Sequence, residues 1–153
     1  MRIAAHGIEL DLPSGWEGRI YRLAGGDPVL HAATFALPTR DGDFGSGATG
    51  IMPPHGAFLA LKEYRPGPRL VPGVGLFAPR SIPLPLHARR FHPRALQVGR
   101  AGQAGFQHFF TASGRPCCLY AVVELGAGQT AFATRAADRV NQLSRILSTL
   151  SIL

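Results

Sequence analysis

The stretch that most constrains the fold is residues 103–125, QAGFQHFFTASGRPCCLYAVVEL. Aromatic and β-branched residues flank a short Ser113-Gly114 turn, and this pattern is the usual signal of a β-hairpin. Side-chain alternation leaves both faces of the two strands largely apolar, so the hairpin is predicted to lie centrally in a sheet with both faces covered. The turn position predicts two directly opposed pairs, Phe110 with Cys117 and His108 with Leu119.

An amphipathic helix is predicted to follow the hairpin. Its apolar residues recur at spacings of three and four: Phe132, Ala136, Val140, Leu143, Leu147 and Leu150. Such a stripe packs one helix face against a core, and Thr130 is a plausible N-cap. The tail over residues 151–153 is a candidate for a short closing strand.

The remaining strands are predicted from alternation and from turn residues. They are 2–12, then 16–23 as the second strand of an opening hairpin, 29–37, 57–64 and, less regularly, 91–98. A chain of 153 residues fits one domain. The prediction is therefore a single α+β domain over 1–153, in which a twisted antiparallel sheet of six or seven strands is backed by the C-terminal helix.

One glycine-rich stretch, residues 45–50, matches the dinucleotide-binding pattern G-x-G-x-x-G literally. That motif requires a strand directly before it and a helix directly after it. Pro53 and Pro54 follow almost at once and oppose a helix. We therefore interpret this stretch as a surface loop.

Residues 66–94 form a proline-rich segment that holds seven of the thirteen prolines. It is too rich in proline for regular core structure, yet it also carries apolar residues throughout, so it does not have the composition of a solvated linker. The segment is expected to pack over an edge or a face of the sheet. Long ordered loops of this kind are often functional.

The positive charge of the chain is unevenly distributed. No acidic residue occurs between Tyr64 and Val123, whereas eight arginines do. An acidic partner is therefore a physical possibility. The segment HARRFHPR over 87–94 combines basic and aromatic side chains, which suit an acidic or mixed protein surface, or a phosphate backbone with one stacked base. A solvated basic loop is the simplest alternative. The predicted partner-binding residues are Arg80, Arg89, Arg90, Phe91 and Arg94.

No constellation of catalytic residues is evident, and no cofactor or metal site is predicted. Adjacent strand residues point to opposite faces, so Cys117 and Cys118 are not expected to meet one metal or substrate together. His108 is the nearest base, on the same face as Cys117. A pocket near these three residues, in a small enzyme or ligand-binding domain, is the alternative to a binding protein.

The expected compartment is the cytoplasm. No apolar run approaches the length that spans a bilayer, the first residues contain no apolar signal-peptide core, and two adjacent cysteines do not form a disulfide framework.

The two ends of the chain resemble a known group. An opening GIELDLPSGW, several strands, a strong hairpin, a C-terminal helix and a closing ILSTLSIL are similar to the PsbP/Mog-like α+β proteins. The resemblance implies an accessory or binding protein and not an enzyme. It leaves out the middle of the chain, so no functional residue is carried over. Together with the charge distribution, it favours a non-catalytic accessory protein that contacts a larger complex through residues 64–100.

Overall fold

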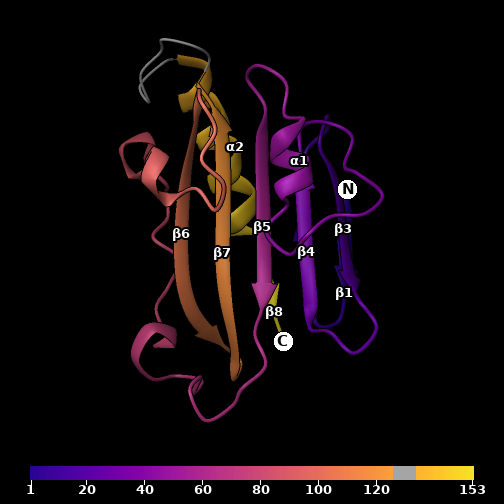
Figure 1. The fold of residues 1–153 in the computed structure, drawn as a ribbon, viewed down its shortest axis with the longest axis vertical. Helices are drawn as coiled ribbons and strands as arrows, with labels where there is room; N and C mark the ends of the chain where they lie inside the picture. The colour runs from indigo at the N-terminus through magenta and orange to yellow at the C-terminus, as the bar shows by residue number, and fades with distance from the viewer. Residues whose placement is uncertain (126–133) are drawn as a thin grey trace.

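The computed structural model describes residues 1–125 and 134–153. Its main element is an antiparallel sheet of five strands in the order β3-β4-β5-β7-β6 (Figure 1). The hairpin has the predicted register, with Phe110 opposite Cys117 and His108 opposite Leu119. The strand bounds are β3 Glu17–Arg22, β4 Pro28–Ala33, β5 Ala57–Glu63, β6 Gln103–Ala112 and β7 Arg115–Glu124.

A second, smaller sheet corrects the prediction of one sheet of six or seven strands. It consists of β1 (Arg2–Ala5), β2 (Ile8–Asp11) and β8 (Ser151–Ile152), in the order β1-β2-β8. His6 and Gly7 have φ angles of 54° and 77°, so the chain reverses there and residues 2–12 form two strands. The segment after Trp16 does not complete this hairpin, because β3 pairs with β4 instead.

The C-terminal helix α2 (Thr134–Ser148) lies behind the large sheet in Figure 1. The predicted apolar stripe is confirmed where it is described: Ala136, Val140, Leu143 and Leu147 are buried in the main core, and Leu150 packs against it. Phe132 and the proposed N-cap Thr130 lie outside the described residues. The closing strand is confirmed as β8. Within the described parts of the chain, no helix has the length and apolar character needed to cross a membrane.

The opposite face of the large sheet is covered by the short helix α1 (Ser46–Gly50) and its flanking loops (Figure 1). Our expectation of a loop over 45–50 was therefore wrong. The prolines come late enough to leave one turn of helix, and both carboxylate oxygens of Asp41 accept N–H groups of that turn, from Gly47 and Ala48 at 2.8 Å each. No strand directly precedes Gly45, so the dinucleotide-binding context is absent among the described residues.

The hairpin is less central than predicted, because β7 has a neighbour on each side whereas β6 forms an edge. The proline-rich segment runs beside that edge and contains three short 3-10 turns: η1 (Gly75–Phe77), η2 (Ala88–Arg90) and η3 (Pro93–Ala95). A single antiparallel bridge joins His92 to Gly105 of β6. The strand expected over 91–98 does not form, because η3 takes its place.

Candidate partner-binding surface

Three buried side chains hold the proline-rich segment against the domain: Phe77, Leu86 and Phe91. Phe77 packs edge-on against Tyr64 and Phe109, with ring centroids 5.2 and 5.7 Å apart. The Leu86 N–H donates to Ser144 Oγ of α2 at 2.8 Å. The segment is therefore an ordered part of the fold, as its apolar content predicted.

Four of the five predicted binding residues are exposed on this segment: Arg80, Arg89, Arg90 and Arg94. Arg89 and Arg90 lie on η2 and Arg94 on η3. Within the described residues, the guanidinium groups of these three make no ion pair or hydrogen bond. That of Arg80 donates to the Gly75 and Leu76 carbonyl oxygens. Their charges are therefore available to a partner.

Phe91 does not belong to this surface, so its place in the predicted binding set requires correction. Its ring is buried in the main core and lies 5.8 Å from the Phe106 ring, at an interplanar angle of 33°. A base or a partner side chain cannot stack on it from outside. The alternation of arginine and aromatic residues in the sequence did not reveal that the aromatic ring anchors the segment from beneath.

His108 belongs to β6, the edge strand of the hairpin, and lies near the arginines of the segment. Its ring stacks with those of Phe106 and Phe110, at centroid distances of 6.5 and 5.4 Å. Burial lowers the pKa of His108, and the nearby charges of Arg80 and Arg90 lower it further. These effects favour the neutral imidazole, so the positive charge of this region comes from the arginines.

The two cysteines do not have the properties of nucleophiles. Both are free and buried, and they lie on opposite faces of β7 as predicted: Cys117 belongs to the main core, whereas Cys118 does not. Burial is the main cause that raises the pKa of each thiol to about 12. A thiol with such a pKa is almost entirely protonated at neutral pH. Neither sulfur is exposed to line an open pocket for a substrate.

Metal-binding geometry is likewise absent from the parts of the chain that the structure describes, since no three His, Cys, Asp or Glu side chains gather there. His87 is exposed, and His92 uses its Nδ1 to accept the backbone N–H of Arg94 at 3.0 Å. That hydrogen bond begins the η3 turn and so has a structural role.

A cavity that the sequence did not indicate lies at the other edge of the large sheet. Its volume is ≈ 550 Å³, and it is lined by Arg19, Tyr21, Leu23, Thr39, Arg40 and Asp41. The alternation of Arg19 and Tyr21 along β3, continued by Leu23 directly after it, was a usable signal, but the loop that completes the cavity could not be placed from its composition. The Tyr21 hydroxyl and Arg19 Nε are buried and have no hydrogen-bond partner among the residues that the structure describes.

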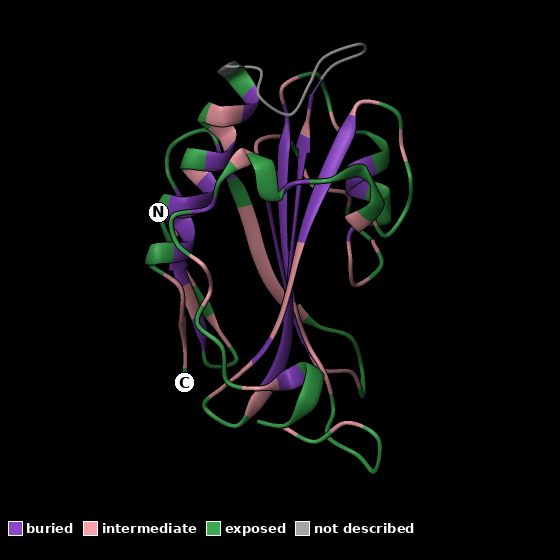
Figure 2. Ribbon diagram, turned by 90° about the vertical axis from the view of Figure 1, so that its left-hand side faces the viewer, coloured by how far each residue is buried: buried purple, intermediate pink, exposed green. Residues whose placement is uncertain are grey.

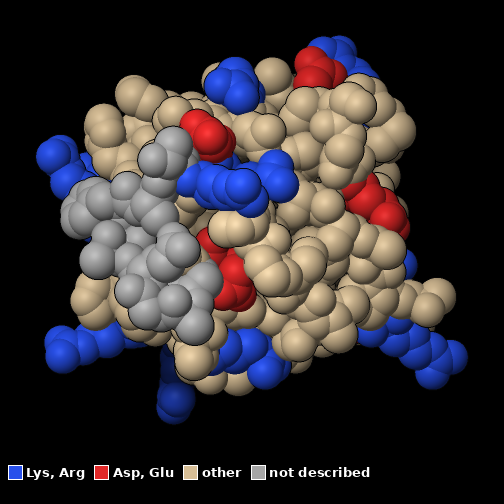
Figure 3. Space-filling view, turned by 90° about the horizontal axis from the view of Figure 1, so that it is seen from above, with Lys and Arg blue, Asp and Glu red and all other residues tan. Residues whose placement is uncertain are grey.

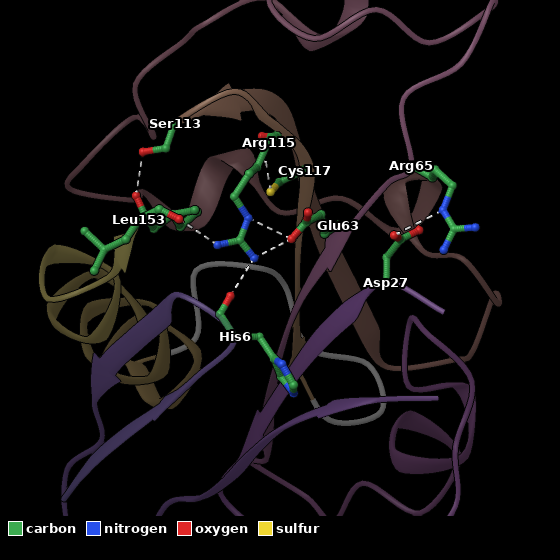
Figure 4. A network of polar contacts seen from close by, with 9 residues as sticks. His6, Asp27, Glu63, Arg65, Ser113, Arg115, Cys117 and Leu153 are labelled. Carbon is green, nitrogen blue, oxygen red and sulfur yellow. Dashed lines mark hydrogen bonds and ion pairs between the residues drawn. The ribbon is translucent and has the colours of Figure 1, made fainter. Parts of the chain in front are cut away.

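A network around Arg115 ties the hairpin end to the small sheet (Figure 4). Arg115 donates to the Glu63 carboxylate, to the His6 carbonyl oxygen at 2.8 Å and to the Leu153 backbone oxygen at 2.9 Å. The Arg115 and Glu63 side chains are each only 16% exposed. All three guanidinium nitrogens of this arginine donate to oxygens of the protein, so it belongs to the scaffold and not to the binding surface.

Comparisons with protein-family models, with curated proteins and with solved structures found no match to this chain. The resemblance to the PsbP/Mog-like group therefore stays a prediction that depends on the two ends of the sequence.

Proposed function

We propose that this chain is a non-catalytic accessory protein that binds a larger protein complex through its basic proline-rich segment. The observation that carries the proposal is the exposure of Arg89, Arg90 and Arg94 together with their lack of ion pairs among the described residues. These side chains lie on a segment anchored by buried Phe77, Leu86 and Phe91. Holding three like charges together contributes nothing evident to the fold, whereas it suits an acidic partner.

The wider charge distribution supports the same interpretation. Lys and Arg side chains project from several places around the outline of the molecule (Figure 3). Those of the segment, however, have no acidic neighbour in sequence between Tyr64 and Val123. A preformed basic surface speeds association with an acidic partner and loses little conformational entropy on binding.

The test is affinity capture of the tagged protein from a lysate of its native host, with and without nuclease, followed by mass spectrometry. The wild type is expected to recover one stoichiometric protein partner in both cases. The variant R89E/R90E/R94E should lose it while unfolding at the same urea concentration as the wild type.

A matched control keeps the charge change constant. Arg22, Arg40 and Arg145 are exposed arginines on other parts of the fold, and R22E/R40E/R145E alters the net charge by the same amount. The control should retain the partner. Equal retention by both triple variants would refute the proposed surface, and recovery that disappears with nuclease would identify nucleic acid as the partner instead.

A further inference from the structure

The most exposed apolar group of the proline-rich segment lies away from the arginines of η2 and η3. Val71, Val74 and Leu76 are each more than half exposed. They belong to the turn around η1, which lies beside the lower end of β6 in Figure 1, next to the loop that extends below the sheet, and is coloured mostly exposed in Figure 2. We call residues 71–76 the apolar tip. Aliphatic side chains gathered at a protruding turn are typical of an interaction site.

The tip is held rigidly by the residues that follow it. The Phe77 carbonyl oxygen accepts the Gly73 N–H at 3.1 Å and the Thr111 hydroxyl of β6 at 2.5 Å. The Gly73 N–H also lies 3.0 Å from Thr111 Oγ1. Because buried Phe77 fixes the base of the turn, the aliphatic side chains of the tip are directed outward by the fold itself.

Several backbone groups of the tip and of the turn that follows it are hydrogen-bonded internally. The Val74, Phe77 and Ala78 N–H groups donate to the Val71, Val74 and Gly75 carbonyl oxygens at 3.1 to 3.3 Å. The Arg80 guanidinium donates to the Gly75 and Leu76 carbonyl oxygens. A backbone that already has hydrogen-bond partners loses less free energy when it leaves water for an apolar environment.

Positive charge flanks the apolar side chains. Arg69 and Arg80 are exposed on either side of the tip, and no acidic residue is nearby in sequence. An aliphatic apex with cations behind it matches a bilayer surface, where acyl chains lie beneath anionic headgroups. A membrane also accepts a convex protrusion without a preformed groove. We therefore propose that the apolar tip inserts into the surface of a membrane rich in anionic lipid. This inference does not depend on the proposed protein partner.

The experiment is flotation of the full chain with vesicles of equimolar phosphatidylcholine and phosphatidylglycerol, compared with vesicles of phosphatidylcholine alone. Wild type is expected to float with the anionic vesicles and to dissociate as salt is raised. V74D/L76D should bind roughly tenfold more weakly or worse, because it removes two apolar side chains and adds repulsion.

A matched control places the same substitutions at the opposite end of the sheet. Ile51 and Val98 are also exposed aliphatic residues, near the starts of β5 and β6, and I51D/V98D should float like the wild type. Absence of wild-type binding to the anionic vesicles would overturn the proposal and leave the tip as a contact for another protein. Equal weakening by V74D/L76D and I51D/V98D would show binding by net charge alone, and would also overturn it.

Insertion has its own optical readout. The chain contains one tryptophan, Trp16, which is buried. L76W adds a second at the apex, whose emission should shift to shorter wavelength when anionic vesicles are added. An unchanged spectrum of the vesicle-bound protein would refute insertion, because the apex would still be in water. R89E/R90E/R94E and V74D/L76D alter different residues. Either proposal can therefore be refuted without refuting the other.

Discussion

Replacing Arg115 with methionine removes the guanidinium group whose hydrogen bonds join the hairpin, β5 and the small sheet. The two hydrogen bonds to the His6 and Leu153 backbone oxygens contribute about 1 kcal/mol each. The Glu63 carboxylate, which is 16% exposed in the wild type, then loses its charged partner, and this costs about 1–2 kcal/mol more. We therefore expect R115M to lower the free energy of unfolding by about 3 kcal/mol.

The assay is equilibrium urea unfolding followed by far-UV circular dichroism. With a slope of about 2 kcal/mol per molar urea, the midpoint should fall by roughly 1.5 M. In the double variant R115M/E63Q the loss should be smaller than the sum of the single losses by about 1–2 kcal/mol, because the neutral amide that replaces the Glu63 carboxylate leaves no charge unpaired.

A second ion pair in Figure 4 supplies the control. Arg65 lies 3.7 Å from Asp27, and its side chain is 68% exposed. An exposed pair of this length contributes little, and the hydrogen bond of Arg65 to the Gly25 carbonyl oxygen is also exposed, so R65M should lower the free energy of unfolding by less than about 1 kcal/mol. A loss below about 1 kcal/mol for R115M, or an equal loss for both variants, would refute the view that burial gives the Arg115 network its strength.

Three further predictions concern single sites. G45A should destabilise the protein by at least about 2 kcal/mol in urea unfolding, because Gly45 has a φ of 67° and a Cβ there would lie 2.1 Å from the Phe58 ring. The thiols of Cys117 and Cys118, whose pKa values burial raises to about 12, should react with a disulfide reagent at neutral pH only after denaturant is added. Burial lowers the pKa of His31, so the unfolded chain takes up a proton that the folded chain resists. The free energy of unfolding should therefore decrease as the pH is lowered from about 7 to about 5, and H31Q should make this decrease smaller.

Each of these predictions has an outcome that contradicts it. Gly25 has a φ of 72° and open space around it, so G25A measures the effect of backbone strain alone. G25A should therefore lower the free energy of unfolding by less than G45A does. Thiol reaction in the native protein would count against buried cysteines. An H31Q variant with the same pH dependence as the wild type would assign the effect to other groups, such as His108, whose pKa is also lowered.

The sequence predicted those features that depend on local patterns. The hairpin register followed from the Ser113-Gly114 turn and from alternation, and α2 followed from its apolar stripe. The division into two sheets could not be predicted, because it depends on which strand β3 pairs with, and both choices satisfy the same alternation. The helix turn after Gly45 required knowing that Asp41 folds back onto it.

Only part of the candidate site could be predicted from the sequence. Arginines without nearby acids are visible in a sequence, and four of the five residues named lie exposed on the segment. Phe91 was assigned to the surface because its neighbours are basic, whereas its burial is decided by contact with Phe106 on a distant strand. The apolar tip was also missed, because the sequence pattern of valine and leucine among prolines is the same whether these side chains are buried or exposed.

The pairing of β2 with β8 joins residues near the two ends of the chain, Ile8 with Ile152. Contacts between residues so far apart in sequence require closure of a very long loop, and topologies rich in such contacts fold slowly. During synthesis the large sheet can assemble as soon as β7 has left the ribosome, since its five strands precede α2. The β1–β2 hairpin is synthesised before the large sheet, yet it can gain its third strand only after β8 has emerged.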